Sequence, residues 1–207
     1  MLEVREVALS RARLLNRVTL GWNVVEALVA IAAGIAASSV SLIGFGLDSV
    51  IEVSASAILA WRLHQEHRGG CMAENDRLAT RLIAVSFAAL AIYVWITGLG
   101  DLIGHSEPDS SAVGVVLAAT SGIVMPPLAR AKRRLALPLG SSAAVSEANQ
   151  TMLCGVLSGV VLVGLALNLT LGWWWADPVA ALLIGVLAAG EAARTWRAES
   201  LADTCCA

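Results

Sequence analysis

The chain has 207 residues, of which 57% are hydrophobic and only 14% are charged. Its mean hydropathy of +0.75 excludes an ordinary soluble domain, because a soluble domain must cover itself with far more polar side chains. The formal net charge is −2 and no basic stripe is present, so nothing indicates a nucleic-acid partner. The composition predicts a polytopic helical membrane protein embedded in the lipid bilayer.

Six segments of the chain contain the roughly 20 apolar residues that a helix needs to cross the hydrocarbon layer. In chain order they are residues 19–38, 40–63, 79–101, 111–129, 142–169 and 173–193. A very short turn near Ser38 and Ser39 joins the first two segments, so we expect them to form an antiparallel pair. The predicted fold class is an all-α membrane protein with six transmembrane helices.

The positions of Lys and Arg predict the orientation of these spans. All 14 basic residues lie before the first span, between the second and third, between the fourth and fifth, or after the sixth. The positive-inside rule then puts both termini in the cytoplasm. An even number of spans independently requires both termini on the same side. We therefore expect a cytoplasmic segment at 1–18, a transmembrane domain at 19–193 and a short cytoplasmic tail at 194–207. No cleavage site follows the first span, so we expect it to be retained and not removed as a signal peptide.

Two acids lie inside the second span, where a charge at the helix centre costs about 2.5–3.5 kcal/mol on insertion scales. Asp48 and Glu52 are one helical turn apart, so both project from the same helix face. A structural ion pair with Lys or Arg would explain them, but the basic residues within the predicted spans, Arg62 and Arg81, lie only at the span ends. A functional role is favoured, because a proton or a divalent cation can neutralise two close carboxylates.

The fifth span carries a second polar set, in which Gln150 and Cys154 have the same spacing and Glu147 lies one turn before Gln150. If the second and fifth spans pack together, their side chains form a four-ligand cluster. A thiolate in that cluster suits Zn²⁺ and similar borderline-soft ions. The alternatives are that Cys154 is a small hydrophobic residue and that Gln150 is an interhelical hydrogen-bonding residue.

Other polar residues have open roles. Glu26 in the first span is a proton site, a third carboxylate near the pair, or an inward hydrogen-bonding group. His64, His67 and Cys71, after the second span, form either an accessory Zn²⁺ site or part of a solvated segment. Cys205 and Cys206 lie in the tail. They could capture metal or carry a lipid, and their role stays open.

These residues resemble the metal site of the cation diffusion facilitator, or cation efflux, family. SLIGFGLDSVIEV is similar to the family motif on span two, and SSAAVSEANQTMLCGVLS is similar to the motif on span five. The match places Asp48, Glu52, Gln150 and Cys154 at the metal-ligand positions, and Glu147 at the preceding acid. FGLDSVIEVSASAILAWR is especially similar to the short branch that includes the vertebrate vesicle zinc transporters, so we expect the C-terminal cytoplasmic domain of larger members to be missing.

The resemblance implies an exporter and not an enzyme. It implies efflux of a divalent metal, Zn²⁺ first and Fe²⁺, Mn²⁺, Co²⁺ or Cd²⁺ as alternatives, by proton antiport through a midplane site on spans two and five. No cofactor is implied. A homodimer held by membrane helices is expected, and the preference for Arg over Lys favours a bacterial cytoplasmic (inner) membrane.

Three departures from the family pattern leave metal identity and transport open. Glu stands at position 52 where the family has Asp, and Gln150 and Cys154 stand where the family has His and Asp. The alternative is a non-transporting membrane protein of the same fold, either a metal sensor or a partner subunit. A transporter of an organic cation is a second alternative.

Overall fold

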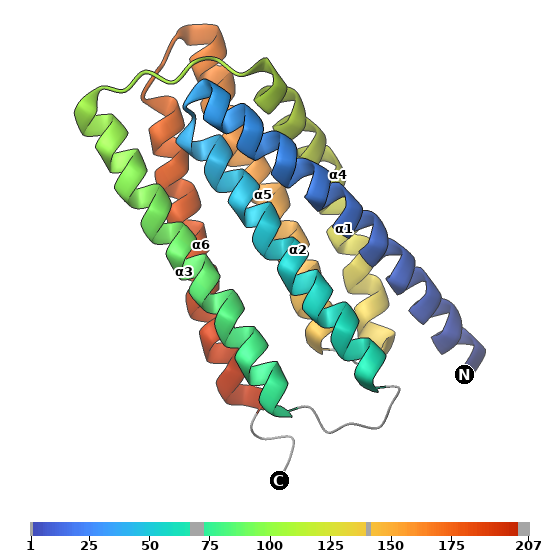
Figure 1. Cartoon of the computed structure of the whole chain (residues 1–207). Coiled ribbons are helices and arrows are strands. Elements are labelled where there is room, and N and C mark those ends of the chain that lie inside the picture. The colour runs from blue at the N-terminus through green and yellow to red at the C-terminus, as the bar shows by residue number, and fades with distance from the viewer. Residues whose placement is uncertain (1, 67–72, 140–141, 203–207) are drawn as a thin grey trace.

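A computed structural model describes residues 2–66, 73–139 and 142–202, with side chains over a smaller part of these ranges. Across this described part the regular structure consists of six helices (Figure 1). They are α1 (Leu2–Ala37), α2 (Val40–Glu66), α3 (Ala73–Gly104), α4 (Ala112–Leu139), α5 (Ser142–Leu171) and α6 (Ala176–Ala202). Each contains a stretch long and apolar enough to cross a membrane. The predicted all-α class and the six spans are therefore confirmed.

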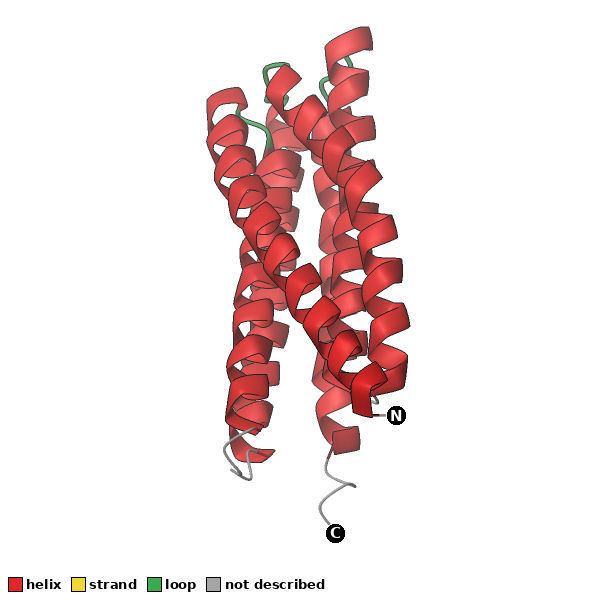
Figure 2. Cartoon of the chain, turned by 90° about the vertical axis from the view of Figure 1, so that its right-hand side faces the viewer, coloured by secondary structure: helices red, strands yellow, loops and turns green. Residues whose placement is uncertain are grey.

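The six helices lie side by side, and their short connections α1–α2, α3–α4 and α5–α6 lie at one end of the bundle (Figures 1 and 2). The start of α1 and the end of α6 lie at the opposite end. Left-handed residues follow three of the helices: Ser38 after α1 with a φ of 51°, His105 after α3 with a φ of 52°, and Gly172 after α5 with a φ of 67°. The amide of Ser39 then donates to the carbonyl of Gly34 at 2.9 Å, which closes the end of α1.

The helices form a group of four and a pair. Helices α1, α2, α5 and α4 contact one another in a ring, and α3 packs mainly against α6 (Figure 1). Helices α2 and α5 join the two groups, because α2 also contacts α3 and α6, and α5 contacts α6. In α2, 67% of the span is buried, more than in any other helix. Polar residues on α2 are therefore held inside the protein.

Two glycines bring α1 and α2 into close contact. A Cβ atom at Gly34 would lie 2.7 Å from Cγ1 of Ile43, and one at Gly46 would lie 2.7 Å from Cγ1 of Ile31. Both distances are too short for real carbon atoms, so these positions need glycine. The close approach fixes how the polar residues of α1 face those of α2.

The fourth helix differs from its prediction. The basic residues expected between spans four and five lie within α4, which runs on to Leu139. Arg133 is exposed, but Lys132 is only 7% exposed and lies within the apolar stretch Ala112–Leu135. The inference that no basic residue lies inside a span is therefore wrong for α4: Arg130, Lys132, Arg133 and Arg134 all lie in this stretch, and Lys132 is the buried one. Its long aliphatic stem allows it to cross apolar surface, and its ammonium reaches a hydroxyl on α5.

One carboxylate ties the ends of two helices together. Asp177, in the first turn of α6, is 1% exposed. Its Oδ1 accepts a hydrogen bond from Ser39 Oγ at 2.6 Å and another from the Ser41 hydroxyl, and the Ser41 amide donates to Oδ2 at 3.4 Å. The acid satisfies groups at the N-terminus of α2, where negative charge is favoured. The start of α6 is therefore fixed to the α1–α2 turn.

Candidate metal site

Polar side chains gather inside the group formed by α1, α2, α4 and α5. They come from all four helices, and each has an exposed fraction of 8% or less. The cluster consists of Asn23, Glu26, Asp48, Ser49, Glu52, Ser121, Lys132, Gln150, Thr151 and Cys154. Large buried side chains such as Phe45 and Leu157 form the core around it. Water is therefore scarce around these groups, and their charges interact strongly.

The structure places Asp48 and Glu52 together in this interior, each 3% exposed. Glu52 Oε1 accepts a hydrogen bond from the Thr151 hydroxyl at 2.9 Å. Its other oxygen, Oε2, is buried and has no hydrogen-bond partner among the described residues. Asp48 experiences the negative charges of Glu52 and Glu26. Buried acids with unsatisfied oxygen atoms are costly unless a cation or a proton neutralises them.

On α5, the structure buries both predicted ligands but treats them differently. Cys154 is fully buried and faces the interior, and its thiol donates to Glu26 Oε2 at a distance of 3.6 Å. Gln150 is 8% exposed and, within the described part of the chain, makes no hydrogen bond to Asp48, Glu52 or Cys154. Since α2 and α5 are in contact, Cys154 lies with the acids, and Gln150 is the least engaged of the four.

Glu26 is the most highly connected acid of the cluster. It is fully buried, and three helices donate hydrogen bonds to it. The Ser49 hydroxyl on α2 donates at 3.2 Å, and the Ser121 hydroxyl on α4 and the Cys154 thiol on α5 also donate. The predicted inward hydrogen bonding is therefore present. The negative charge of Glu26 also acts on Glu52 and Asp48, so it is a third acid beside the pair.

Five residues of the cluster were missed from the sequence: Asn23, Ser49, Ser121, Lys132 and Thr151. Of these, Lys132 and Asn23 both act on Glu52. Lys132 Nζ donates to the Thr151 hydroxyl at 3.1 Å, and its positive charge acts on Glu52. Asn23 is fully buried and faces Glu52, yet neither of its amide atoms has a partner in hydrogen-bonding geometry among the described residues. A signal for Asn23 was present, because Thr19, Asn23 and Glu26 form a polar stripe at helical spacing on α1.

The cluster is not yet arranged as a closed coordination shell. Among the described residues, no three His, Cys, Asp or Glu side chains surround a single point as metal ligands do. One pair already has the required spacing. With Zn–S near 2.3 Å and Zn–O near 2.0 Å, two tetrahedral ligands lie about 3.5 Å apart, and Glu26 Oε2 lies 3.6 Å from Cys154 Sγ. Binding an ion requires Asp48 and Glu52 to turn toward this pair.

The accessory residues stay predictions. Glu147 lies in α5 and His64 near the end of α2, but their side chains lie outside the described part of the structure. A further set lies wholly outside the described residues: His67, Cys71, Cys205 and Cys206.

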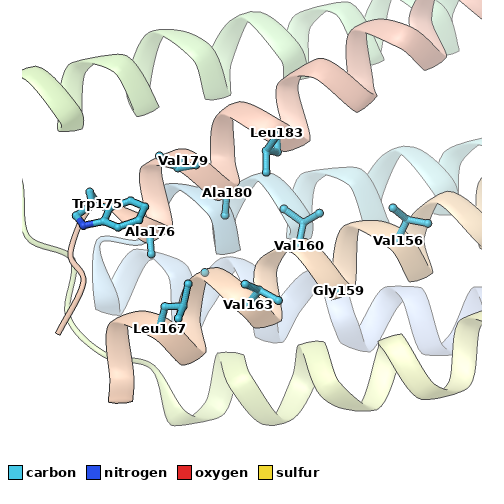
Figure 3. A pocket seen from close by; sticks show the side chains of 11 residues that line it. Val156, Gly159, Val160, Val163, Leu167, Trp175, Ala176, Val179, Ala180 and Leu183 are labelled. Carbon is cyan, nitrogen blue, oxygen red and sulfur yellow. The ribbon is translucent and has the colours of Figure 1, made fainter. Parts of the chain in front are cut away.

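An apolar groove lies between α5 and α6, with a volume of about 420 Å³ (Figure 3). Val163 and Leu183 line it, and Trp175 lies at one end. These side chains offer no oxygen, sulfur or imidazole ligand, so the groove is not a metal site. Gly159 opens into it, whereas a Cβ at Gly155 would lie 3.1 Å from Pro126 on α4. Gly155 therefore serves the close packing of α5 against α4.

A six-helix membrane bundle with an acidic, thiol-containing interior defines the class of this protein. Residues 17–201 match the family described as the cation efflux transmembrane domain. The chain therefore belongs to the cation efflux family, and it is an integral, multi-pass membrane protein.

Two curated relatives are similar over most of the chain. Transmembrane protein 163 of Xenopus laevis is 24% identical over 172 residues, which cover 80% of this chain and 59% of that protein. The uncharacterized transporter sll1263 of Synechocystis sp. is 27% identical over 159 residues, which cover 71% of this chain and 49% of that protein. The chain thus spans about half to three fifths of the length of these relatives.

Proposed function

We propose that this protein binds a divalent metal cation between α1, α2 and α5 and exports it by alternating access. The observation that carries the proposal is the buried contact of Cys154 with Glu26, beside the α2 pair Asp48 and Glu52. Three acids and a thiol in a dry interior repel one another when ionised. A divalent cation bound among these groups removes this repulsion.

The donor set favours a borderline-soft transition metal. Carboxylate oxygens alone suit Mg²⁺ or Ca²⁺, but the thiol of Cys154 selects ions such as Zn²⁺. Zn²⁺ is therefore the first candidate, followed by Cd²⁺, Co²⁺, Fe²⁺ and Mn²⁺. In the proposed shell Asp48, Glu52 and Cys154 bind directly, Gln150 is the weakest member, and Glu26 is a proton or accessory group.

Proton coupling follows from the same ligands. A thiol and carboxylic acids must lose their protons to bind a metal, so protons leave the site as the ion enters. If protons return from the far side, they eject the ion, and the inward proton gradient drives export. With both termini in the cytoplasm of a bacterium, this is antiport across the inner membrane.

A homodimer remains part of the proposal. Helices of the transmembrane region would hold the two copies together. Cross-linking in native membranes, with single cysteines introduced along α3 and α6 in turn, tests this point separately from transport.

One observation favours the rival function, a metal sensor or partner subunit. Lys132 supplies a positive charge beside Glu52, and a structural ion pair is the ordinary explanation for a buried acid. The rival predicts that the protein moves no ion, and that Lys132 only stabilises the fold.

Flux into proteoliposomes separates the two functions. Purified protein is reconstituted into vesicles that contain a metal indicator. Metal is added outside, a pH difference is imposed across the membrane, and metal entry is followed by the indicator. We expect Zn²⁺ flux that depends on the pH difference and is lost in Asp48→Asn. No flux above empty vesicles for Zn²⁺, Cd²⁺, Co²⁺, Fe²⁺ or Mn²⁺ contradicts the proposal. Addition of small organic cations must leave the flux unchanged.

A further inference from the structure

We propose that Lys132 is a built-in counterion of the empty site, whose influence an incoming divalent cation must overcome. The inference rests on the proposed metal site and adds to it a residue of α4, a helix that contributes none of the predicted ligands. It concerns what balances the buried acids between one transported ion and the next.

The Lys132 ammonium reaches the acids through one hydroxyl group. Lys132 Nζ donates to Thr151 Oγ1 at 3.1 Å, and the same hydroxyl donates to Glu52 Oε1 at 2.9 Å. The link therefore runs from α4 through α5 to α2. Both Thr151 and Glu52 are buried, and Lys132 is only 7% exposed. Bulk water screens such a charge weakly, so its effect on Glu52 is strong.

The neighbouring residue on α4 shows that this position is special. Arg133 is exposed and points away from the interior, as a basic residue near a helix end ordinarily does. Lys132 instead gives up contact with water and gains a hydrogen bond to Thr151. Burial of an ammonium group is costly unless negative charge lies nearby, and the Lys132 charge acts on Glu52.

A fixed ammonium and a mobile divalent cation compete for the same negative charge. In the empty site, Lys132 offsets part of the repulsion among Glu26, Asp48 and Glu52. When an ion enters, the same ammonium repels it and lowers the affinity of the site. Release becomes easier, which a transporter needs, because an ion that binds too tightly does not leave.

The test is Zn²⁺ binding to purified protein, measured by competition with a chromophoric chelator. The parent carries Cys71→Ser, Cys205→Ser and Cys206→Ser, so that Cys154 is its sole thiol. Into this parent we place Lys132→Gln, Lys132→Arg and, as the matched control, Arg133→Gln. We expect Lys132→Gln to lower the Kd about tenfold, as loss of one nearby like charge in a buried site implies, and to slow Zn²⁺ release by a similar factor.

The controls separate a counterion from a structural group. Lys132→Arg keeps the charge, and Arg133→Gln removes an exposed charge, so both must bind Zn²⁺ as the parent does. Thr151→Val removes the link but keeps the shape and the lysine, and it must tighten binding less than Lys132→Gln. If Lys132→Gln does not fold, Lys132→Met decides, because it also removes the charge but keeps an apolar stem, and unchanged or weaker binding in this variant overturns the inference.

The possible failures are distinguishable. Unchanged or weaker Zn²⁺ binding by a folded Lys132→Gln protein overturns the role of Lys132 and leaves the metal site intact. If the parent itself binds no Zn²⁺, the proposed function fails, and this inference fails with it.

Discussion

The thiol of Cys154 lies 3.6 Å from Oε2 of Glu26, so the middle of α5 is joined to α1 as well as to the acidic helix α2. The sequence motif relates Cys154 only to Asp48 and Glu52. The structure adds a third helix to the site, and with it a carboxylate that can replace the one missing from α5. Two predictions test this relationship directly.

Replacement of Cys154 should change which ion is preferred. In Cys154→Ser the soft sulfur ligand is lost, so we expect Zn²⁺ and Cd²⁺ affinity to fall about tenfold or more relative to Mn²⁺. Cys154→Asp restores the acid that the family motif has, and it should bind Mn²⁺ better than the parent does. The measurement is competitive binding of the three ions to purified protein. An unchanged Zn²⁺ to Mn²⁺ ratio in Cys154→Ser would show that the thiol is not a ligand.

Replacement of Glu26 should weaken metal binding more than it weakens the fold. Glu26→Gln keeps the size and one acceptor oxygen for the Ser49 and Ser121 hydroxyls but removes the charge. We expect the Zn²⁺ affinity to fall about tenfold, which corresponds to a loss of about 1.4 kcal/mol of binding free energy. The thermal-unfolding midpoint should change little. Glu107→Gln, which alters an exposed carboxylate between α3 and α4, is the control. A lower midpoint with unchanged affinity would assign Glu26 a structural role only.

Much of the fold followed from the sequence, because hydropathy and span length depend on local composition alone. The six spans and the turn at Ser38 and Ser39 needed no knowledge of packing. Helix α4 runs on to Leu139, beyond the predicted span end at residue 129, which was chosen because charged residues normally mark a helix end outside the membrane. Lys132 breaks this rule since its partner is on another helix, and a single sequence contains no information about that contact.

The same limit explains the candidate site. Spacing alone placed Asp48 with Glu52, and Gln150 with Cys154, on single helix faces. It did not give the rotation of α1, which determines that Glu26 meets Cys154. That rotation depends on close packing at Gly34 and Gly46, where the partner atoms come from residues of the adjacent helix. The rotation of α1 relative to α2 and α5 could therefore not be predicted from the sequence.

Enlarging Gly46 should separate α1 from α2. A Cβ atom there would lie 2.7 Å from Ile31 Cγ1 and 3.0 Å from the Ile31 amide nitrogen. We expect Gly46→Ala to cost about 1–3 kcal/mol, the usual range for overpacking, and to lower the thermal-unfolding midpoint in detergent. Gly100→Ala on α3 is the matched control, because no atom lies within 4 Å of its added Cβ. Equal midpoints for the two variants would contradict the predicted close contact.

Loss of the Asp177 carboxylate should loosen the end of the bundle that carries the α1–α2 and α5–α6 connections. Asp177→Ala leaves the Ser39 and Ser41 hydroxyls without their buried acceptor, at a cost of about 1–3 kcal/mol. Asp177→Asn keeps one acceptor oxygen and should lose less stability. Thermal unfolding of the two variants, together with proteolysis near the α1–α2 turn, measures the effect. If Asp177→Ala unfolds at the temperature of the parent, this contact does not fix α6 to α2.

The central claim, a divalent ion held by sulfur and carboxylate oxygen inside the bundle, is tested most directly by X-ray absorption at the Zn edge. The sample is the protein with Cys154 as its sole thiol, loaded with one equivalent of Zn²⁺. We predict one sulfur neighbour at about 2.3 Å and oxygen or nitrogen neighbours near 2.0 Å, with the sulfur lost in Cys154→Ser. A spectrum with oxygen and nitrogen neighbours alone, and identical in the two proteins, would contradict the account.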